Sequence, residues 1–585
     1  MGNQVVTSAQ REQSSRQCTQ SQVLDLIMNR DYAFDLMKAS NILAITAVAL
    51  IALLLPGECL GEAVGQQGYL KGSDPFFPHS FGASLGISGD TIVVGSYDES
   101  SEGQDSGAAY VFLRNGSTWT PQAFLKPLTL HEFDNFGESV AISGDTIVIG
   151  APGDASSSSG VNGDPNDTSA PRAGAAYIFV RVGTNWVQQA YLKASNCEAD
   201  DMFGFTVAIS SNTVVIGALQ EDSSATGVNG LQGDNSAGDS GAAYVFVRNG
   251  TNWSQQAYLK ASNTGANDAF GCSVAISGET IVVGAFREDS SSTGVNGNQL
   301  NDNASDAGAA YVFVRNGFTW SQQAYLKASN TDARDIFGGS VALSGNTTVV
   351  GAQGESSSSR SVNGNQSDNS SGGSGAAYVF VRTGTNWAQQ SYLKASNADS
   401  GDCFGGSVAI SGDTIVIGAP CEGSSGRGID TGQADNTAPF AGAAYAFVRG
   451  GGVWIQQAYL KASNAERQDF FGGAVAVYDD TTVIGASEED SAATGVNGDQ
   501  TDNSNSGAGA AYVFGGLGRG VLRDGTGGYI LFFKGIPGLS YRIERAPTVT
   551  GPWSAMATNV ANEIGTISVH DTNALPVQAF YRTVR

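Results

Sequence analysis

Residues 270–326 read FGCSVAISGETIVVGAFREDSSSTGVNGNQLNDNASDAGAAYVFVRNGFTWSQQAYL, and this unit determines the fold. Within it, SVAIS (273–277) alternates apolar and small residues and, after a Gly-Glu turn, is followed by TIVVGA. Beyond a long polar stretch, AAYVFVR places Tyr311 and Phe313 on one face, and a turn leads into WSQQAYLK. Period-two alternation between Gly/Asn turns is the signature of strand hairpins. The unit therefore predicts four antiparallel strands.

The unit occurs seven times along the chain. The tyrosine of the string GAAY recurs every 67 residues, and the dipeptide Phe-Gly recurs after 55 residues once and then after 67. The tyrosines are Tyr110, Tyr177, Tyr244, Tyr311, Tyr378, Tyr445 and Tyr512, and the phenylalanines are Phe81, Phe136, Phe203, Phe270, Phe337, Phe404 and Phe471. A twisted four-stranded sheet repeated radially is a propeller blade. The sequence therefore predicts an all-β, seven-bladed β-propeller.

The two ends of the repeat region complement each other. The seventh unit stops after AAYVF (510–514) and lacks its WxQQAYLK strand. The segment VGQQGYLK (64–71) matches WVQQAYLK (186–193) position by position, with Val64 where the Trp would be. We therefore expect the N-terminal strand to complete the last blade and close the ring. Closure removes the two exposed sheet edges of an open array.

The N-terminus contains an apolar run, ILAITAVALIALLL (42–55). Its length fits a signal peptide and is short for a membrane span. Met37-Lys38 precedes it, and Gly61-Glu62-Ala63 follows with small residues where a signal peptidase cleaves. We expect residues 1–36 to be an over-extended N-terminus, residues 37–63 a signal peptide, and the mature chain to begin near Val64 with no transmembrane span. The alternative is a membrane anchor with a short cytoplasmic tail.

The propeller is predicted over residues 64–516, and the repeat stops after it. Residues 520–585 contain GYILFFKG, LSYRIERAP, GPWSAMATNV, GTISVHDT and QAFYRTVR, which predict five short strands. The stretch YRIERAPTVTGPW (541–553) is similar to a fibronectin-like β-sandwich pattern. We expect a small β-sandwich-like C-terminal module.

Charge and cysteine usage restrict the partners. The net charge is −25 and the pI is about 4.4, so the chain repels phosphate backbones and nucleic acid is not expected to bind. The negative charge does not exclude cations, cationic surfaces or neutral glycans as ligands. The six cysteines have neither CxxC pairing nor His at zinc spacing. Cys403 and Cys421 flank one predicted hairpin, and whether they form a cross-strand disulfide is open because bridging needs a geometry that sequence does not define.

The stretch FGGSVAISGDTIVIGAP (404–420) resembles the FG-GAP repeat of integrin α-subunit head domains and of bacterial secreted proteins. The resemblance implies a secreted or cell-surface recognition or adhesion protein, not an enzyme, that binds an extracellular protein or glycan through one propeller face. We expect it to be a monomer. In integrin-type repeats the turn between the first two strands carries a DxDxDG calcium loop, but here that turn is Ser411-Gly412-Asp413 or its equivalents. Calcium therefore does not transfer to those positions.

The ligand should bind where the long loops gather. Because strands in a blade alternate in direction, the long loops between the second and third strands all fall on one face, and long loops on a rigid scaffold usually carry recognition. They read EDSSSTGVNGNQLNDNASDAG (288–308) and close variants. One interpretation is a crown of oxygen ligands for calcium or sugars. The other is a solvated, flexible polar crown that keeps a Gly-rich protein soluble.

Some recurring residues favour a structural role. An Asp two residues before the Phe suggests a cap on backbone N–H groups at each strand entrance, and the Trp and Lys of the fourth strand suggest packing and outer-strand positions. The aspartates are Asp134, Asp201, Asp268, Asp335, Asp402 and Asp469, the tryptophans are Trp119, Trp186, Trp253, Trp320, Trp387 and Trp454, and the lysines are Lys126 and its equivalents.

The first blade breaks the symmetry. Its long loop is about 12 residues shorter, and His79 replaces the recurrent Asp. His131 lies at the entrance of the next blade, close to Glu132 and Asp134. Imidazole and carboxylate suit a metal or acid–base site, so His79, His131, Glu132 and Asp134 are the candidate ligand-binding residues. An extracellular hydrolase or lyase with a site near His79 and His131 is the alternative function, and drift in a surface loop is the structural alternative. The chain contains no GxSxG, HExxH or P-loop motif.

Overall fold

The computed structural model describes residues 64–585 except 74–78, 102, 130, 451, 519, 524–527, 535–538, 548–550, 562–565, 573–579 and 585. The expected N-terminal extension (1–36) and signal peptide (37–63) lie outside the described residues. Within the described part of the chain, no helix is long and apolar enough to cross a membrane.

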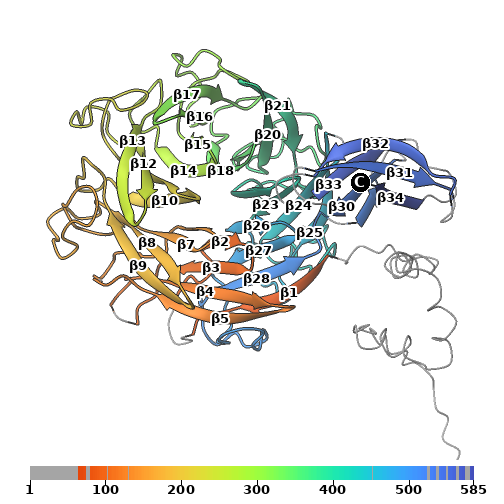
Figure 1. Ribbon diagram of the computed structural model, residues 1–585, viewed down its shortest axis with the longest axis horizontal. Helices are drawn as coiled ribbons and strands as arrows, with labels where there is room; N and C mark the ends of the chain where they lie inside the picture. Colours follow the sequence, from red (N-terminus) through yellow and green to blue (C-terminus); the bar gives the residue numbers. More distant parts are fainter. Residues whose placement is uncertain are drawn as a thin grey trace, which may run out of the picture. The chain divides into compact units, whose positions relative to one another are not determined.

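The repeats fold into seven four-stranded antiparallel sheets, which we number as blades 1 to 7 (Figure 1). Blade 1 contains β2 (Ser84–Ser88), β3 (Thr91–Ser96), β4 (Ala108–Asn115) and β5 (Thr118–Leu125). Blade 2 contains β6 (Val140–Ser143), β7 (Thr146–Ala151), β8 (Ala175–Val182) and β9 (Asn185–Leu192). Blade 3 contains β10 (Phe203–Ser210), β11 (Thr213–Ala218), β12 (Ala242–Asn249) and β13 (Asn252–Leu259). Blade 4 contains β14 (Phe270–Ser277), β15 (Thr280–Ala285), β16 (Ala309–Asn316) and β17 (Thr319–Leu326).

The remaining blades have the same order. Blade 5 contains β18 (Phe337–Ser344), β19 (Thr347–Ala352), β20 (Ala376–Thr383) and β21 (Asn386–Leu393). Blade 6 contains β22 (Ser407–Ser411), β23 (Thr414–Ala419), β24 (Ala443–Gly450) and β25 (Val453–Leu460). Blade 7 contains β26 (Val475–Tyr478), β27 (Thr481–Ala486), β28 (Ala510–Gly515) and, from the other end of the chain, β1 (Gly65–Leu70).

The Phe-Gly dipeptide explains why neighbouring blades pack closely. In blade 4, the Phe270 ring packs edge-on against Tyr311, with centroids 5.4 Å apart, inside its own sheet. Gly271 has φ +93°, and a Cβ there would lie 2.2 Å from the carbonyl oxygen of Ala242 in blade 3. Likewise, a Cβ on Gly284 would lie 1.9 Å from the carbonyl oxygen of Gly338 in blade 5. Only glycine permits these approaches, so the recurring sequence encodes the contact between blades.

The first strands of the blades contact one another in cyclic order. Each contacts the first strand of the next blade, and β26 of blade 7 contacts β2 of blade 1. Figure 1 shows these strands around the central axis. The second strands, such as β15, are buried along their whole length and form the middle of each sheet.

The N-terminal strand completes blade 7, as expected. β1 pairs antiparallel with β28, with Tyr69 opposite Tyr512. The Tyr69 hydroxyl donates to Glu489 Oε1 at 2.9 Å, and Lys71 Nζ donates to Glu489 Oε2 at 2.8 Å. Lys71 and Glu489 are both buried. A buried ion pair therefore joins the N-terminal strand to the last blade.

The C-terminal residues form two three-stranded sheets. One contains β29 (Gly520–Arg523), β30 (Tyr529–Lys534) and β33 (Thr566–Asp571), and the other contains β31 (Ser540–Ala546), β32 (Ser554–Val560) and β34 (Phe580–Val584). Leu531, Ile543 and Ile567 form a small core between the two sheets. Ile530 packs against Val448 and Ile455 of blade 6. The described residues of this module form six strands, which is one more than the five that the sequence predicts, and the additional strand is β29.

Removal of the closing cation tests the role of this ion pair. We expect Lys71→Met to lower the free energy of unfolding by about 3–5 kcal/mol, because it leaves Glu489 as a buried charge without its cation. Urea unfolding monitored by tryptophan fluorescence measures the change. As the control, Arg427→Met removes the cation of an exposed ion pair with Glu466, and such pairs contribute at most about 1 kcal/mol. Equal stability of the two variants would contradict the expectation.

Candidate functional site: the long-loop face

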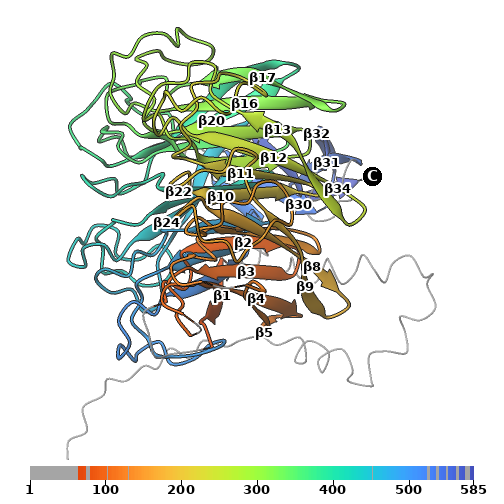
Figure 2. The same ribbon diagram turned by 90° about the vertical axis from the view of Figure 1, so that its left-hand side faces the viewer.

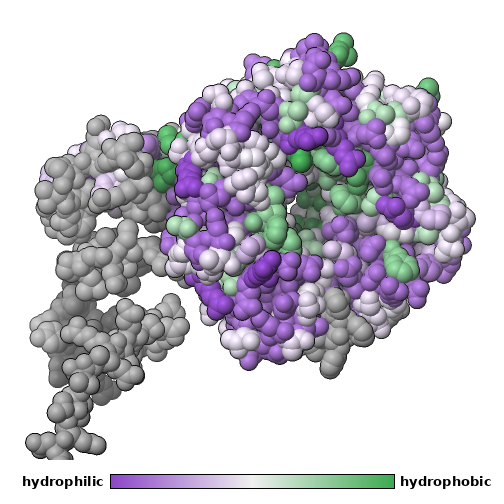
Figure 3. Space-filling view, turned by 180° about the vertical axis from the view of Figure 1, so that it is seen from behind, coloured by the Kyte–Doolittle hydropathy of each residue, from purple (hydrophilic) through white to green (hydrophobic). Residues whose placement is uncertain are grey.

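The loops between the second and third strands project from one side of the sheets (Figure 2). In blade 2 this loop runs from residue 152 to residue 174, whereas in blade 1 it runs only from residue 97 to residue 107. The loops joining consecutive blades emerge on the same side. We call this side the long-loop face, and Figure 3 looks onto it.

A buried carboxylate anchors each long loop. In blade 3, Glu221 accepts hydrogen bonds from the Tyr258 hydroxyl at 2.7 Å and from Lys260 Nζ at 2.9 Å, both at the end of the outer strand β13. It also accepts one from Asn196 Nδ2 at 2.8 Å, in the connection from blade 2. The Asn196 Oδ1 atom in turn accepts from the Tyr244 hydroxyl at 2.6 Å. We call this carboxylate and its donors the loop anchor.

The ion pair of the loop anchor is present in every blade. The pairs are Lys126–Glu99, Lys193–Asp154, Lys260–Glu221, Lys327–Glu288, Lys394–Glu355, Lys461–Glu422 and Lys71–Glu489. The repeat pattern predicts outer-strand packing positions for Lys126 and its equivalents, and it does not reveal their buried partners. An acidic residue four positions after the glycine of Gly-Ala recurs with the same period and was the available signal.

The long loops are hydrogen-bonded along their length. In blade 3, Ser224 Oγ donates to Asp234, and the Asp239 N–H donates to Asp222 Oδ1 at 2.8 Å. Asn235 Nδ2 donates to Glu198, in the connection from blade 2. The Ser224 hydroxyl lowers the pKa of Asp234. The loop oxygens are therefore already used as acceptors. Within the described residues, no group of three or more His, Cys, Asp or Glu side chains could hold a metal ion.

The recurrent aspartates cap the strand entrances, in agreement with the structural interpretation. Asp268 Oδ2 accepts from the Gly265 N–H at 2.8 Å, and Asp134 Oδ2 accepts from the His131 N–H at 3.0 Å. The other four caps have the same geometry, with the N–H three residues earlier as donor. Burial raises the pKa of these carboxyls. It reaches about 7 for Asp134, Asp268, Asp335 and Asp402, and about 8 for Asp201 and Asp469.

The structure places the four candidate ligand-binding residues in different surroundings. His131 Nδ1 lies 3.6 Å from Asp134 Oδ2, so these two side chains are neighbours. Asp134, however, is one of the buried caps. His79 is only 3% exposed, and the carbonyl oxygen of this residue accepts from Ser96 Oγ at 2.6 Å. The carboxyl near its imidazole is Asp98; burial raises the pKa of Asp98, and the imidazole opposes that rise. Glu132 is exposed.

Glu132 lines a pocket of about 290 Å³ on the long-loop face. Its other walls include Phe133, Pro171, Arg172 and Met202, and the Arg172 guanidinium lies 3.1 Å from Met202 Sδ. Phe133 is 50% exposed. The repeat does not preserve this lining. The position of Phe133 holds Asp200, Asn267, Arg334 and Gly401 in the next four blades, and that of Arg172 holds Asp239, Asp306, Gly373 and Phe440.

Apolar side chains extend from this pocket over the neighbouring blades. Leu231 and Leu300, in the long loops of blades 3 and 4, are 83% and 86% exposed. We call Phe133, Leu231 and Leu300 the apolar sector. Figure 3 shows apolar side chains on outlying parts of the face and around its central hollow. The three side chains lie in loops of blades 2, 3 and 4 on the long-loop face.

A second feature of the face is acidic. Burial and the nearby Asp98 raise the pKa of Glu138 to about 7. Burial and the same Asp98 also raise the pKa of Glu488. Ser80 Oγ donates to Asp98 Oδ2 at 2.7 Å. Blades 7, 1 and 2 therefore carry carboxyls close enough to affect one another.

A family model of the FG-GAP repeat matches seven segments of the chain. They are residues 64–112, 119–179, 186–246, 253–313, 320–380, 387–447 and 454–514. The chain belongs to the FG-GAP repeat family. FG-GAP repeats suggest an integrin-like propeller and are typical of extracellular or cell-surface proteins. A search among curated proteins finds no match.

Each full FG-GAP match begins near the outer strand of one blade and ends in the third strand of the next. Residues 186–246, for example, run from β9 of blade 2 to β12 of blade 3. The first match begins at Val64, at the start of the strand that joins blade 7. The family unit is thus displaced by one strand from the blade, which is the offset that lets β1 complete the last sheet.

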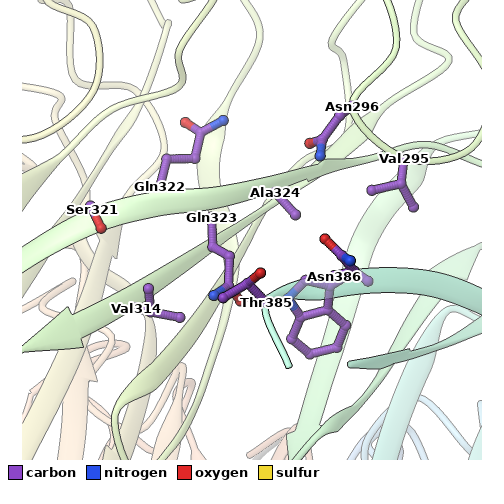
Figure 4. Close-up of a pocket in the computed structure, with 10 residues that line it drawn as sticks. Val295, Asn296, Val314, Ser321, Gln322, Gln323, Ala324, Thr385 and Asn386 are labelled. Atoms are coloured by element: carbon purple, nitrogen blue, oxygen red, sulfur yellow. Dashed lines mark hydrogen bonds between the residues drawn. The ribbon is translucent and has the colours of Figure 1, made fainter. Parts of the chain in front are cut away.

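The outer side of the FG-GAP propeller carries a groove of about 540 Å³ between blades 4 and 5 (Figure 4). Gln322 and Gln323 of β17 and Asn386 of β21 line it. Trp387, also in its wall, is buried, and its Nε1 donates to Gln323 Oε1 at 2.8 Å. The same Trp–Gln bond recurs in blades 2, 3, 4 and 6. This repetition and the burial of the ring confirm the packing interpretation of the tryptophans.

The hydrogen-bonded loops lead to an expectation about calcium. Because the loop oxygens are already acceptors, we expect the thermal unfolding midpoint of the FG-GAP propeller to be the same in EDTA and in millimolar calcium. A cation bound only by the folded state at a hundred times its Kd would add about 2.7 kcal/mol. Differential scanning calorimetry measures the midpoint. A rise of several degrees in calcium would instead support cation sites in the long loops.

The buried caps predict stability at acid pH. Their pKa values in the folded protein lie above the ordinary Asp value of 3.8, so the folded state binds more protons. Their contribution is present below about pH 4 and is lost as the pH rises through 7 to 8. We expect Asp268→Asn to reduce the fall in the thermal midpoint between about pH 5.5 and pH 9, because the amide stays neutral.

A matched variant controls for general effects of charge. Asp234 is exposed and its pKa is lowered, so it stays ionised over this range. Asp234→Asn should leave the pH dependence of the midpoint unchanged. If the thermal midpoint fell equally steeply with pH in the wild type and in Asp268→Asn, Asp268 would have to be ionised in the folded protein.

Proposed function

We propose that this protein is a secreted or cell-surface recognition protein that binds an extracellular polypeptide through the long-loop face. The observation that carries the proposal is the apolar sector, Phe133, Leu231 and Leu300, on neighbouring blades. A polar, acidic protein gains nothing in solubility from such side chains, whereas a partner that covers them gains the free energy of their burial.

The loop anchors support the same proposal. Each long loop is held at its base by a buried ion pair and along its length by side-chain hydrogen bonds. A partner therefore meets loops that are already ordered, and little conformational entropy is lost on binding. Ordered loops with exposed apolar side chains therefore bury apolar area on binding at a low entropic cost.

The charge of the face favours a partner with basic groups. The chain carries a net charge of −25, and the long loops carry aspartates whose pKa is lowered by hydrogen bonds from hydroxyl groups and which are therefore ionised at neutral pH, such as Asp234 and Asp435. Complementary charge accelerates encounter and is screened by salt. The partner would place apolar side chains against blades 2 to 4 and basic side chains beside the ionised aspartates of the long loops.

We propose no catalytic role for the His79 and His131 region. The His79 side chain is buried, and Asp134, the neighbour of His131, is committed to a backbone N–H. A general acid or base must reach the proton that it transfers. These two observations favour a binding module over the hydrolase or lyase alternative.

Variants of the apolar sector test the proposal. The triple variant Phe133→Ser, Leu231→Ser, Leu300→Ser should bind at least about tenfold more weakly than wild type, because a factor of ten corresponds to only about 1.4 kcal/mol. Binding of the purified protein to a panel of immobilised extracellular proteins and to a glycan array, followed by biolayer interferometry, supplies the affinities.

The control is Phe318→Ser. Phe318 is 88% exposed but lies in the short turn between β16 and β17, on the opposite side of the blade from the long loops. The Phe318→Ser variant should leave binding unchanged. Binding to glycans alone, or an equal loss in the control, would contradict a polypeptide-binding long-loop face.

A further inference from the structure

Cys403 and Cys421 stand at the two open ends of one hairpin. Cys403 lies just before β22, and Cys421 lies just after β23, at the start of the long loop of blade 6. Both are free thiols in the structure and both are only partly buried. Neither is part of a loop anchor or of the apolar sector.

The repeat places these two positions on neighbouring chain segments. Asn135 and Gly153 occupy the same positions in blade 2, where a Cβ on Gly153 would lie 1.8 Å from the carbonyl oxygen of Phe133 and 3.0 Å from Asn135 Oδ1, so that blade 2 needs glycine there. The Gly153 N–H donates to the carbonyl oxygen of Asp134, next to Asn135, at 3.1 Å. The backbone thus holds the two positions side by side.

Blade 6 itself has the same arrangement. The point where Gly406 would carry a Cβ lies 3.2 Å from the carbonyl oxygen of Cys403 and 3.3 Å from Cδ of Pro420, the residue before Cys421. The two thiols also interact directly. The neighbouring Cys403 thiol lowers the pKa of Cys421, and the Cys403 S–H donates to the carbonyl oxygen of Gly401 at 3.4 Å. Cys421 is therefore the better nucleophile of the pair.

We propose that Cys403 and Cys421 are a modification site at which the exported protein acquires a disulfide bond. The oxidant is a disulfide-bearing molecule, either a thiol oxidoreductase or oxidised glutathione. The Cys421 thiolate attacks one sulfur of the oxidant and forms a mixed disulfide, which releases one thiolate. The Cys403 thiolate then attacks the Cys421 sulfur and releases the second. Two S–H bonds become one S–S bond, and the two protons and two electrons pass to the oxidant, whose disulfide is thereby reduced to two thiols.

The bond would fasten the base of the long loop of blade 6. It would join the entrance of β22 to the exit of β23, where the long loop of blade 6 begins. The crosslink adds a covalent tie to a hairpin that is already formed. Because it requires the side-by-side placement that the backbone provides, it should form without rearrangement of the blade.

Two other cysteines are internal controls. Cys272 is buried, and its Sγ lies 3.5 Å from the carbonyl oxygen of Gly338. Cys197 Sγ lies 3.3 Å from the carbonyl oxygen of Ser156. Cys197 and Cys272 belong to different blades, so each should stay a thiol under conditions that oxidise the pair.

Peptide mapping of the full chain tests the inference. The protein is incubated with oxidised glutathione, denatured, alkylated with N-ethylmaleimide and digested, and the peptides are identified by mass spectrometry. We expect a crosslinked peptide containing Cys403 and Cys421 that disappears on treatment with dithiothreitol, with Cys197 and Cys272 alkylated. Alkylation or glutathionylation of both Cys403 and Cys421, or a crosslink from either to another cysteine, would overturn the inference.

A stability measurement distinguishes the effect of the disulfide bond from the effect of the two thiols. Reduction should lower the thermal midpoint of the oxidised wild type by several degrees and leave the Cys403→Ser, Cys421→Ser double variant unchanged. Blade 2 forms the same hairpin with Asn135 and Gly153, so the variant is expected to fold. A midpoint that is equally insensitive to reduction in both proteins would count against a disulfide that fastens the hairpin.

Discussion

The buried carboxylate at the base of each long loop is the interaction on which the rest of the structure depends. Glu221 and its equivalents lie in the interior, where an unpaired charge would be strongly destabilising. A lysine and, in most blades, a tyrosine and an asparagine satisfy it. These donors come from the outer strand of the same blade and from the connection that leaves the preceding blade. One side chain therefore holds together a loop, a sheet edge and the junction between two blades.

Blade 2 shows how the loop anchor tolerates change. Its acidic residue is Asp154, shorter by one methylene, and Thr129 stands where other blades have the asparagine. Tyr177 and Tyr191 both donate directly to Asp154, at 3.2 and 2.9 Å, so the carboxylate is still satisfied. In blade 7 the donors Tyr69 and Lys71 come from the N-terminal strand. The same interaction thus serves both as a repeated support and as the closure of the propeller.

The seven blades, the strand that joins blade 7 and the aspartate caps could be predicted from the sequence, because each follows from a pattern with a fixed period. The Lys260–Glu221 pair was missed because its members lie 39 positions apart and periodicity alone does not show which recurring residues touch. The burial of His79 was missed for a related reason, since its polarity suggested an accessible side chain. Phe133, Leu231 and Leu300 could not be selected because burial of an apolar residue in a loop depends on the surrounding fold.

The division between repeated and unrepeated residues has a physical basis. The glycines, aromatics and loop anchors are bound to neighbours on several sides, so a change in one of them disturbs two blades at once. The side chains of Phe133, Leu231 and Leu300 extend into solvent, and a change there leaves the sheet contacts intact. The lower half of each loop is thus constrained by folding, and its tip is free to vary. Recognition on such a propeller should accordingly reside in the residues that depart from the repeat, on the face where the anchored loops hold them in place.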